Sequence, residues 1–363
     1  MKVVIAPDGF GGTLTALEAA DAIADGWLGE RPDDDVVLVP MSDGGEGLLD
    51  VVARPDDTWI VTEVAGPLGH PVDAALLLRS DGSALIESAR ACGLALVPSE
   101  RRTPRLATSY GVGELLDAAR DVGATRISVG LGGSASVDGG AGALTGLGLR
   151  VTVADGSGLK IGDDDLHRVA AASWGWAEDW SGIEVVLLAD VPHVLADAAR
   201  VFGPQKGATP DEVEGLTAAL GTWADVAERD LARGQRHRDE PGSGAAGGLG
   251  FGLRCALPTT SVARGVDVVA DLVGLDDALA GADLVITGEG RLDQTSWTTK
   301  VVAAVHERAR AAGVATVAAV VGSVSTGTDT ERLDVVESAS ESGPGPDPSG
   351  DVEAAAARLA RRH

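Results

Sequence analysis

The sequence predicts an α/β protein with parallel sheets, and three observations support this fold class. Apolar runs such as residues 3–6 and 284–287 are typical of strands that are buried on both faces. Each run is followed by a glycine-rich turn with a carboxylate, and amphipathic helical patterns alternate with the runs. Because ligands bind outside the carboxyl ends of parallel strands, we expect these turns to form a binding site.

The amino-terminal segment predicts a strand, a turn and a helix. The first strand leads into a turn that contains Asp8, and Thr15-Ala16-Leu17-Glu18 matches a capping box. In this motif two side chains each accept a hydrogen bond from the other residue's backbone, so we expect a helix from there to about residue 27. A second strand over residues 36–39 runs into a turn with Asp43 and then a further helical stretch.

Three later apolar runs, which end at residues 131, 188 and 287, lead into turns of the same kind. These turns contain the candidate site residues Gly132, Gly133, Ser134, Asp138, Asp190, Glu289 and Arg291. A helix follows the last of them, to about residue 311.

The stretch from residue 61 to residue 89 predicts antiparallel pairing. Its short strands are separated by Gly-Pro-Leu-Gly and Ser-Asp-Gly turns, which favour hairpins. We therefore predict a second, mixed α/β domain inserted over residues 61–260. The first domain is then discontinuous, over residues 1–60 and 261–363, and we expect the active site in the cleft between the two domains.

Composition excludes several classes of protein. The net charge of −26 argues against nucleic acid and anionic membranes as partners. No run of eighteen apolar residues occurs, and a strand follows Met1 directly, so we expect a cytoplasmic, soluble protein. Two distant cysteines and six scattered histidines have no metal-binding spacing.

Eight glycine-rich motifs follow one another along nearly the whole chain. They are Ala6-Pro7-Asp8-Gly9-Phe10, Asp43-Gly44-Gly45-Glu46-Gly47, Gly66-Pro67-Leu68-Gly69, Gly130-Leu131-Gly132-Gly133-Ser134-Ala135, Asp138-Gly139-Gly140-Ala141-Gly142, Val201-Phe202-Gly203-Pro204-Gln205-Lys206-Gly207-Ala208, Pro241-Gly242-Ser243-Gly244-Ala245-Ala246-Gly247-Gly248-Leu249-Gly250 and Ile286-Thr287-Gly288-Glu289-Gly290-Arg291-Leu292-Asp293. In this order they resemble the bacterial glycerate kinase family, of the glycerate 2-kinase type. The resemblance implies a flavodoxin-like first domain, ATP and Mg²⁺ as cofactors, and 2-phosphoglycerate as the product.

The chain departs from the family pattern at three places. Gly11 stands where the family usually has lysine, and Thr299 stands where it has glycine. Residues 190–197 differ from the family's usual segment after Asp190 and are a few positions shorter.

Phosphoryl transfer requires charge neutralisation and positioning, and the sequence offers candidates for both. Gly132, Gly133 and Ser134 follow a strand, so their N–H groups and hydroxyl could bind phosphate, with Asp138 nearby. The alternative is a plain tight turn. No Gly-x-x-x-x-Gly-Lys-Ser/Thr pattern occurs, so the chain is not a Walker-type kinase.

Cations for the phosphates are scarce, because the chain has only four lysines. Lys206 lies between Pro204-Gln205 and Gly207, and Lys300 precedes a predicted helix. We assign Lys206 a catalytic role, stabilising the transferring phosphoryl group, and expect Lys300 and Arg291 to bind phosphate. The alternatives are a solvated lysine and a surface ion pair.

Four carboxylates, Asp8, Asp43, Asp190 and Glu289, follow apolar strands. Mg²⁺ binds through one or two carboxylates plus phosphate oxygens, and we assign Asp43 and Glu289 to the metal. Asp190, or else Asp8, would accept the proton of the substrate hydroxyl. The alternative for each carboxylate is helix capping.

The resulting hypothesis is an ATP-dependent kinase of glycerate that works as a monomer or homodimer. Two alternatives stay open: a kinase of another small hydroxy acid, and a regulator that binds a nucleotide or anion without catalysis.

Overall fold

The computed structural model describes residues 1–363 except 162–163, 176–178, 191, 299 and 341–344. The chain forms two compact units. Unit 1 contains Met1–Asp43, Asp50–Val52 and Arg264–His363, and unit 2 contains Gly44–Leu49 and Ala53–Ala263. The described part of the chain contains no helix that is both long and apolar enough to cross a bilayer.

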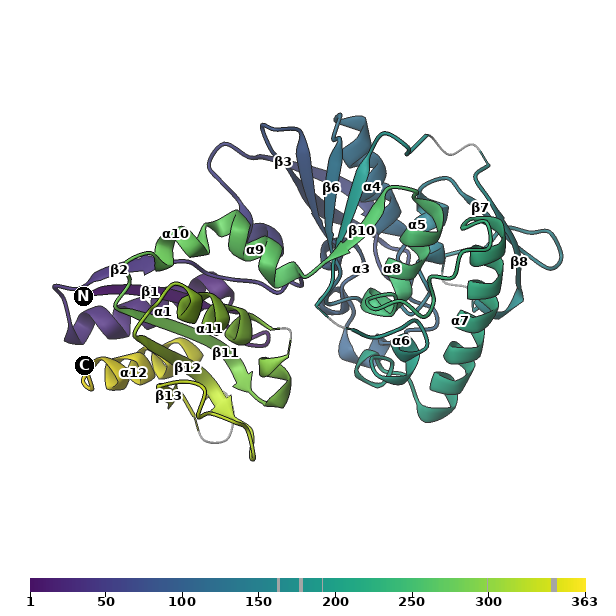
Figure 1. Ribbon diagram of the computed structural model, residues 1–363. Helices are drawn as coiled ribbons and strands as arrows, with labels where there is room; N and C mark the ends of the chain where they lie inside the picture. The colour runs from purple at the N-terminus through teal and green to yellow at the C-terminus, as the bar shows by residue number, and fades with distance from the viewer. Residues whose placement is uncertain (162–163, 176–178, 191, 299, 341–344) are drawn as a thin grey trace. The chain divides into compact units, whose positions relative to one another are not determined.

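Unit 1 is built on a five-stranded parallel sheet (Figure 1). In spatial order its strands are β13 (Val335–Ser338), β12 (Thr316–Val324), β11 (Leu284–Leu292), β1 (Lys2–Pro7) and β2 (Asp35–Leu38). If the five strands are numbered 1 to 5 in chain order, the sheet read from β2 to β13 has the order 2-1-3-4-5. In doubly wound sheets of this order the switch point lies between the first and third strands, here β1 and β11.

Helices cover the sheet of unit 1. They are α1 (Ala16–Glu30), α9 (Gly265–Val273), α10 (Leu275–Leu279), α11 (Val301–Ala311) and α12 (Pro348–Ala360). Val3 and Ile5 of β1 pack with α1 and α12 in one buried cluster. Helix α11 contacts β11 and β1, but its buried side chains lie outside this cluster, as expected for a helix on the opposite face.

The predicted capping box at the start of α1 is confirmed. The Thr15 N–H donates to Glu18 Oε2 at 2.8 Å, and the Glu18 N–H donates to Thr15 Oγ1 at 3.2 Å. The helix ends at Glu30, slightly beyond the predicted end, because its buried stripe continues to Trp27.

Gly26 allows α1 and α12 to pack closely. A Cβ at this position would overlap with the Glu353 carbonyl of α12, so Gly26→Ala should lower the free energy of unfolding by about 1–3 kcal/mol. Gly29 is the matched control, since a Cβ there meets nothing within 4 Å. Gly29→Ala should leave stability unchanged or raise it by up to about 1 kcal/mol. Urea unfolding measures both, and equal effects would contradict close packing at Gly26.

Unit 2 contains a six-stranded mixed sheet. In spatial order its strands are β10 (Thr260–Ala263), β9 (Glu184–Leu188), β6 (Arg126–Gly130), β5 (Ser83–Glu87), β4 (Pro71–Leu78) and β3 (Thr58–Ala65). The predicted antiparallel pairing is confirmed, because β3 pairs with β4 and β4 with β5 in antiparallel register. Strands β5, β6, β9 and β10 are mutually parallel, so their carboxyl ends share one edge.

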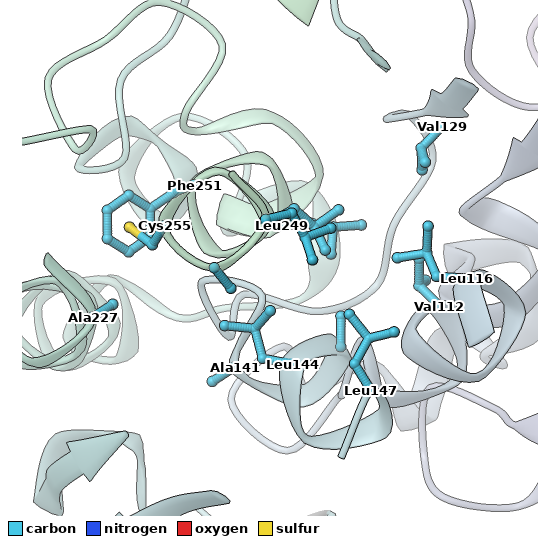
Figure 2. Close-up of a cluster of buried hydrophobic side chains, with 14 of the residues drawn as sticks. Val112, Leu116, Val129, Ala141, Leu144, Leu147, Ala227, Leu249, Phe251 and Cys255 are labelled. Carbon is cyan, nitrogen blue, oxygen red and sulfur yellow. The ribbon is translucent and has the colours of Figure 1, made fainter. Parts of the chain in front are cut away.

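The helices of unit 2 share one large apolar core with this sheet. They are α3 (Ala89–Cys92), α4 (Tyr110–Asp121), α5 (Ala141–Gly146), α6 (Asp197–Arg200), α7 (Pro210–Asp230) and α8 (Ala245–Ala256). Figure 2 shows part of this core, where Leu116, Leu144 and Leu249 come from α4, α5 and α8. A separate hairpin pairs β7 (Arg150–Val153) with β8 (Val169–Ser173), and α2 (Leu48–Val52) contains residues of both units.

Candidate active site

Unit 1 has a cavity of about 370 Å³ at the carboxyl ends of β1 and β11. Its charged lining residues are Asp8, Asp43, Glu289, Arg291, Asp293, Lys300 and Asp351. Five of these are sequence-predicted site residues, and they come from segments far apart in the chain. Strand pairing explains the arrangement, since β1 and β11 are neighbours and Pro7 lies opposite Gly288. The cavity therefore lies at the switch point of the sheet, where doubly wound proteins bind ligands.

Asp8 is the carboxylate at the end of β1. Its N–H donates to the Gly288 carbonyl at 2.8 Å, and its Oδ1 accepts the Gly9 N–H at 2.7 Å. Burial raises the pKa of Asp8 well above its ordinary value, and the charges of Asp43 and Glu289 raise it further. The Gly9 hydrogen bond and the Lys300 charge act in the opposite direction on this pKa. A bound proton or a nearby cation would therefore stabilise the Asp8 side chain in the folded protein.

Glu289 is buried and forms an ion pair with Lys300. Lys300 Nζ lies 3.6 Å from Glu289 Oε2, and Lys300 is the N-cap residue of α11. Burial raises the pKa of Glu289, although a hydrogen bond from Ser296 and the Lys300 charge oppose this rise. Glu289 Oε1 is buried and accepts no hydrogen bond from the described residues. A buried carboxylate oxygen of this kind is well suited to accept a cation or a ligand hydroxyl.

The carboxylates of this cavity can supply only some of the ligands that Mg²⁺ needs. The described residues contain no group of three or more acidic, histidine or cysteine side chains placed to hold a metal ion. Mg²⁺ in proteins is commonly held by one or two carboxylates together with phosphate oxygens and water. Asp8, Asp43 and Glu289 lie around one cavity, and the Asp43 and Glu289 charges act on Asp8. A carboxylate pair completed by phosphate oxygens therefore fits this geometry.

In unit 2 the turn after β6 is tied to a buried lysine. Lys206 is only 4% exposed, and its Nζ donates to Ser134 Oγ at 2.8 Å and to the Ser136 carbonyl at 2.7 Å. Burial lowers the pKa of Lys206 to about 8, although the Cys92 and Asp138 side chains oppose this shift. The solvated-lysine alternative is wrong, because Lys206 is enclosed by the Gly132–Ser134 turn and the segment that follows it.

Gly132 and Gly133 occupy positions that larger residues would strain. A Cβ at Gly132 would lie 2.5 Å from Gly45 Cα, and Gly133 has a φ of +64°. The turn therefore packs backbone to backbone against the Gly44–Gly47 segment, and a side chain at either glycine would disturb this packing.

Asp138 organises the helices beside this turn. Its two carboxylate oxygens accept the N–H groups of Ser109, Gly140 and Gly142 and the Ser109 hydroxyl, at 2.8–3.3 Å. Burial raises its pKa, and these hydrogen bonds oppose the rise. Asp138 thus fixes the starts of α4 and α5, a capping role that was not among the alternatives considered for this residue.

Asp190 follows β9 and is half-buried. Because β6 and β9 are parallel neighbours, Asp190 and the Gly132–Ser134 turn follow adjacent strand ends. Val191, the next residue in the altered segment, and Thr299 lie outside the described residues.

The predicted site residues thus form two groups. Asp8, Asp43, Glu289, Arg291 and Lys300 line the cavity of unit 1, whereas Gly132, Gly133, Ser134, Asp138, Asp190 and Lys206 belong to unit 2. That all of them line one cleft stays a prediction.

Sequence reasoning missed Glu87. This buried residue ends β5, and its oxygens accept the N–H groups of Gly47 at 3.0 Å and Leu49 at 3.3 Å. It therefore holds the glycine-rich turn that follows Asp43. A carboxylate directly after an apolar run was the signal used at the other turns, and it also applied to Glu87.

Fold and site together define an α/β protein with acidic, glycine-rich turns at the ends of parallel strands. Comparisons with known proteins identify the family within this class. The model of the glycerate kinase family matches residues 3–362. The chain belongs to the glycerate kinase family, which confirms the resemblance seen in its eight motifs.

Individual relatives agree with this placement. The chain is 43% identical to a glycerate kinase of Haemophilus influenzae over 302 residues, covering 82% of this chain and 79% of the relative. It is 39% identical to glycerate 2-kinase of Escherichia coli, over 83% of this chain and 80% of that one. A crystal structure of a candidate glycerate kinase 2 from Salmonella typhimurium LT2 superposes with a TM-score of 0.80 at 38% identity, covering 100% of this chain and 98% of that one.

Proposed function

We propose that this chain transfers the γ-phosphate of ATP to a hydroxyl of glycerate, with 2-phosphoglycerate as the product. Family membership supports the reaction class, and the carboxylate cavity of unit 1 is the observation that carries the chemistry. A kinase needs acidic groups for the metal and the proton and basic groups for the phosphoryl charge, and this cavity contains both.

In the proposed mechanism each group of residues has a separate task. Asp43 and Glu289 would hold the metal, and Arg291 and Lys300 would bind phosphate oxygens. Mg²⁺, when bound, supplies positive charge that neutralises the phosphates. The amides of Gly132–Ser134 donate to the transferring phosphoryl group, and Lys206 supports that turn from behind through Ser134 and Ser136.

The general base in this proposal is Asp190 or Asp8. A base works best when its pKa lies near the pH of the reaction, and the raised pKa of Asp8 favours that residue. We also propose that unit 1 is a flavodoxin-like domain, since its strand order corresponds to that fold.

A coupled ADP-release assay tests the proposal. Purified protein with ATP and Mg²⁺ should release ADP when D-glycerate is added, and EDTA in excess over Mg²⁺ should abolish the release. Other small hydroxy acids provide the comparison. Turnover on another acid but not on glycerate would favour the alternative kinase, which the altered residues 190–197 permit. ATP binding without turnover on any acid would favour the non-catalytic regulator.

A further inference from the structure

Unit 2 contains a second cavity, of about 460 Å³, that the proposed mechanism does not use. It lies among residues 105–108, the start of α4, helix α5, the first half of α7 and residues 159–161, 164, 166 and 167. Many of its lining residues are apolar, among them Val137, Leu159, Leu166, Leu216 and Ala219, and the aromatic residue Tyr110 also lines it.

The charges around this cavity disfavour an anion. Its acidic lining residues, Asp138, Asp164, Asp211 and Glu212, outnumber the basic Arg105 and Lys160. Arg105 is already engaged, since it lies 2.8 Å from Asp164 and 3.7 Å from Glu212. Asp138 is also satisfied, because its oxygens accept four hydrogen bonds from Ser109, Gly140 and Gly142. A ligand in this cavity can therefore make apolar contacts and stack on Tyr110. Both interactions suit an uncharged, flat ring.

The cavity is connected to the phosphate-binding turn by a short piece of chain. Val137 lines the cavity, and Ser134 lies three positions earlier, at most about 11 Å away along the backbone. Lys206 holds this piece at Ser134 and Ser136, so its two ends are fixed relative to each other. A ligand with a flat base at one end and phosphates at the other matches this arrangement.

We infer that the unit 2 cavity binds the adenine base of the nucleotide. The inference rests on the proposed function, because ATP is the donor there. Beyond the proposed function, it specifies the cavity that binds the base and the side chain that stacks on the base.

The chain has a single tyrosine, Tyr110, which gives a direct probe of this cavity. Protein labelled with 3-fluorotyrosine should show one ¹⁹F resonance from the folded protein. Adenosine, which has no phosphates, should shift this resonance, and so should ATP. Tripolyphosphate and glycerate should leave it in place, because neither has a flat base.

Two glycines of α7 provide a matched pair of variants. Gly215 lines the cavity and Gly221 does not, and a Cβ at either position meets nothing within 4 Å. Gly215→Trp should place a ring in the cavity and weaken adenosine binding by about tenfold or more, the size of one lost stacking contact. Gly221→Trp should bind adenosine as the unmodified protein does. In the ADP-release assay, Gly215→Trp should raise KM for ATP and leave KM for glycerate unchanged.

The outcomes separate the inference from the proposed function. If ATP supports turnover while adenosine neither shifts the Tyr110 resonance nor competes with ATP, the base binds elsewhere and the inference is overturned. Equal adenosine affinity in Gly215→Trp and Gly221→Trp would overturn it as well. If adenosine shifts the resonance and Gly215→Trp removes the shift, but no acid is phosphorylated, the proposed reaction fails and the base site stands.

Discussion

Lys206→Met should lower kcat/KM by about 100-fold or more, roughly 3 kcal/mol of transition-state stabilisation. Methionine has a similar length but cannot donate to Ser134 Oγ or to the Ser136 carbonyl, which Lys206 Nζ holds at 2.8 and 2.7 Å. The buried carbonyl then loses its partner, and the turn that presents the Gly132–Ser134 amides loosens. Lys2→Met is the control, because Lys2 lies outside both groups of site residues.

The pH profile separates the positive charge of Lys206 from its hydrogen bonds, which a neutral amine can also donate. Burial lowers the pKa of Lys206 from 10.5 to about 8, so activity that depends on the cation should fall as pH rises through about 8. The effect on stability has the opposite sign. Between pH 8 and 10.5 the unfolded chain binds more protons than the folded one, so this group makes the free energy of unfolding rise with pH. In Lys206→Met the alkaline fall in kcat/KM should be absent. An unchanged profile together with unchanged kcat/KM would remove Lys206 from the reaction.

Asp8→Asn should lower kcat by about 10²–10⁴-fold and at the same time make the protein more stable. The amide cannot accept a proton from the substrate, and it is a poorer partner for a cation. Its oxygen can still accept the Gly9 N–H that Asp8 Oδ1 accepts at 2.7 Å. Stability rises because burial and the charges of Asp43 and Glu289 disfavour the charged form of Asp8.

The stability gain should depend on pH in a defined direction. The pKa of Asp8 is raised in the folded protein, so the wild type regains stability as pH falls through that raised pKa. The advantage of Asp8→Asn in urea unfolding should therefore be largest above this raised pKa and shrink as pH falls through it. Asp25→Asn, at an exposed position on α1, controls for the loss of one charge. A less stable Asp8→Asn protein would contradict the repulsion, and an unchanged kcat would exclude Asp8 as base.

Features that depend on local sequence patterns could be predicted from the sequence. The apolar runs predicted the strands, and the Thr15–Glu18 capping box predicted the start of α1. The rule that carboxylates follow parallel strands led to Asp8 and Glu289, which line one cavity although they are far apart in the chain.

Pairings over long distances could not be predicted in this way. Scarcity of lysine pointed to Lys206, but its partner Ser134 is 72 positions away, and no local pattern reveals that the lysine is buried. The capping role of Asp138 depends on Ser109, 29 positions earlier. The rule for carboxylates after apolar strands also applied to Glu87, but its partners could not be predicted, because they are backbone N–H groups near residue 47.

The pairing of β1 with β11 has a consequence for biosynthesis. Strand β1 leaves the ribosome early, but its parallel neighbour begins at Leu284, about 250 residues after β2 is complete. At translation rates of about 5–20 residues per second, β1 and β2 wait roughly 12–50 s for the strand that completes the sheet. During this interval all residues of unit 2 have been synthesised, so unit 2 can fold first. The nascent chain meanwhile carries an apolar strand, residues 3–6, with one edge unpaired, which makes this period the most exposed to aggregation and the most open to chaperones.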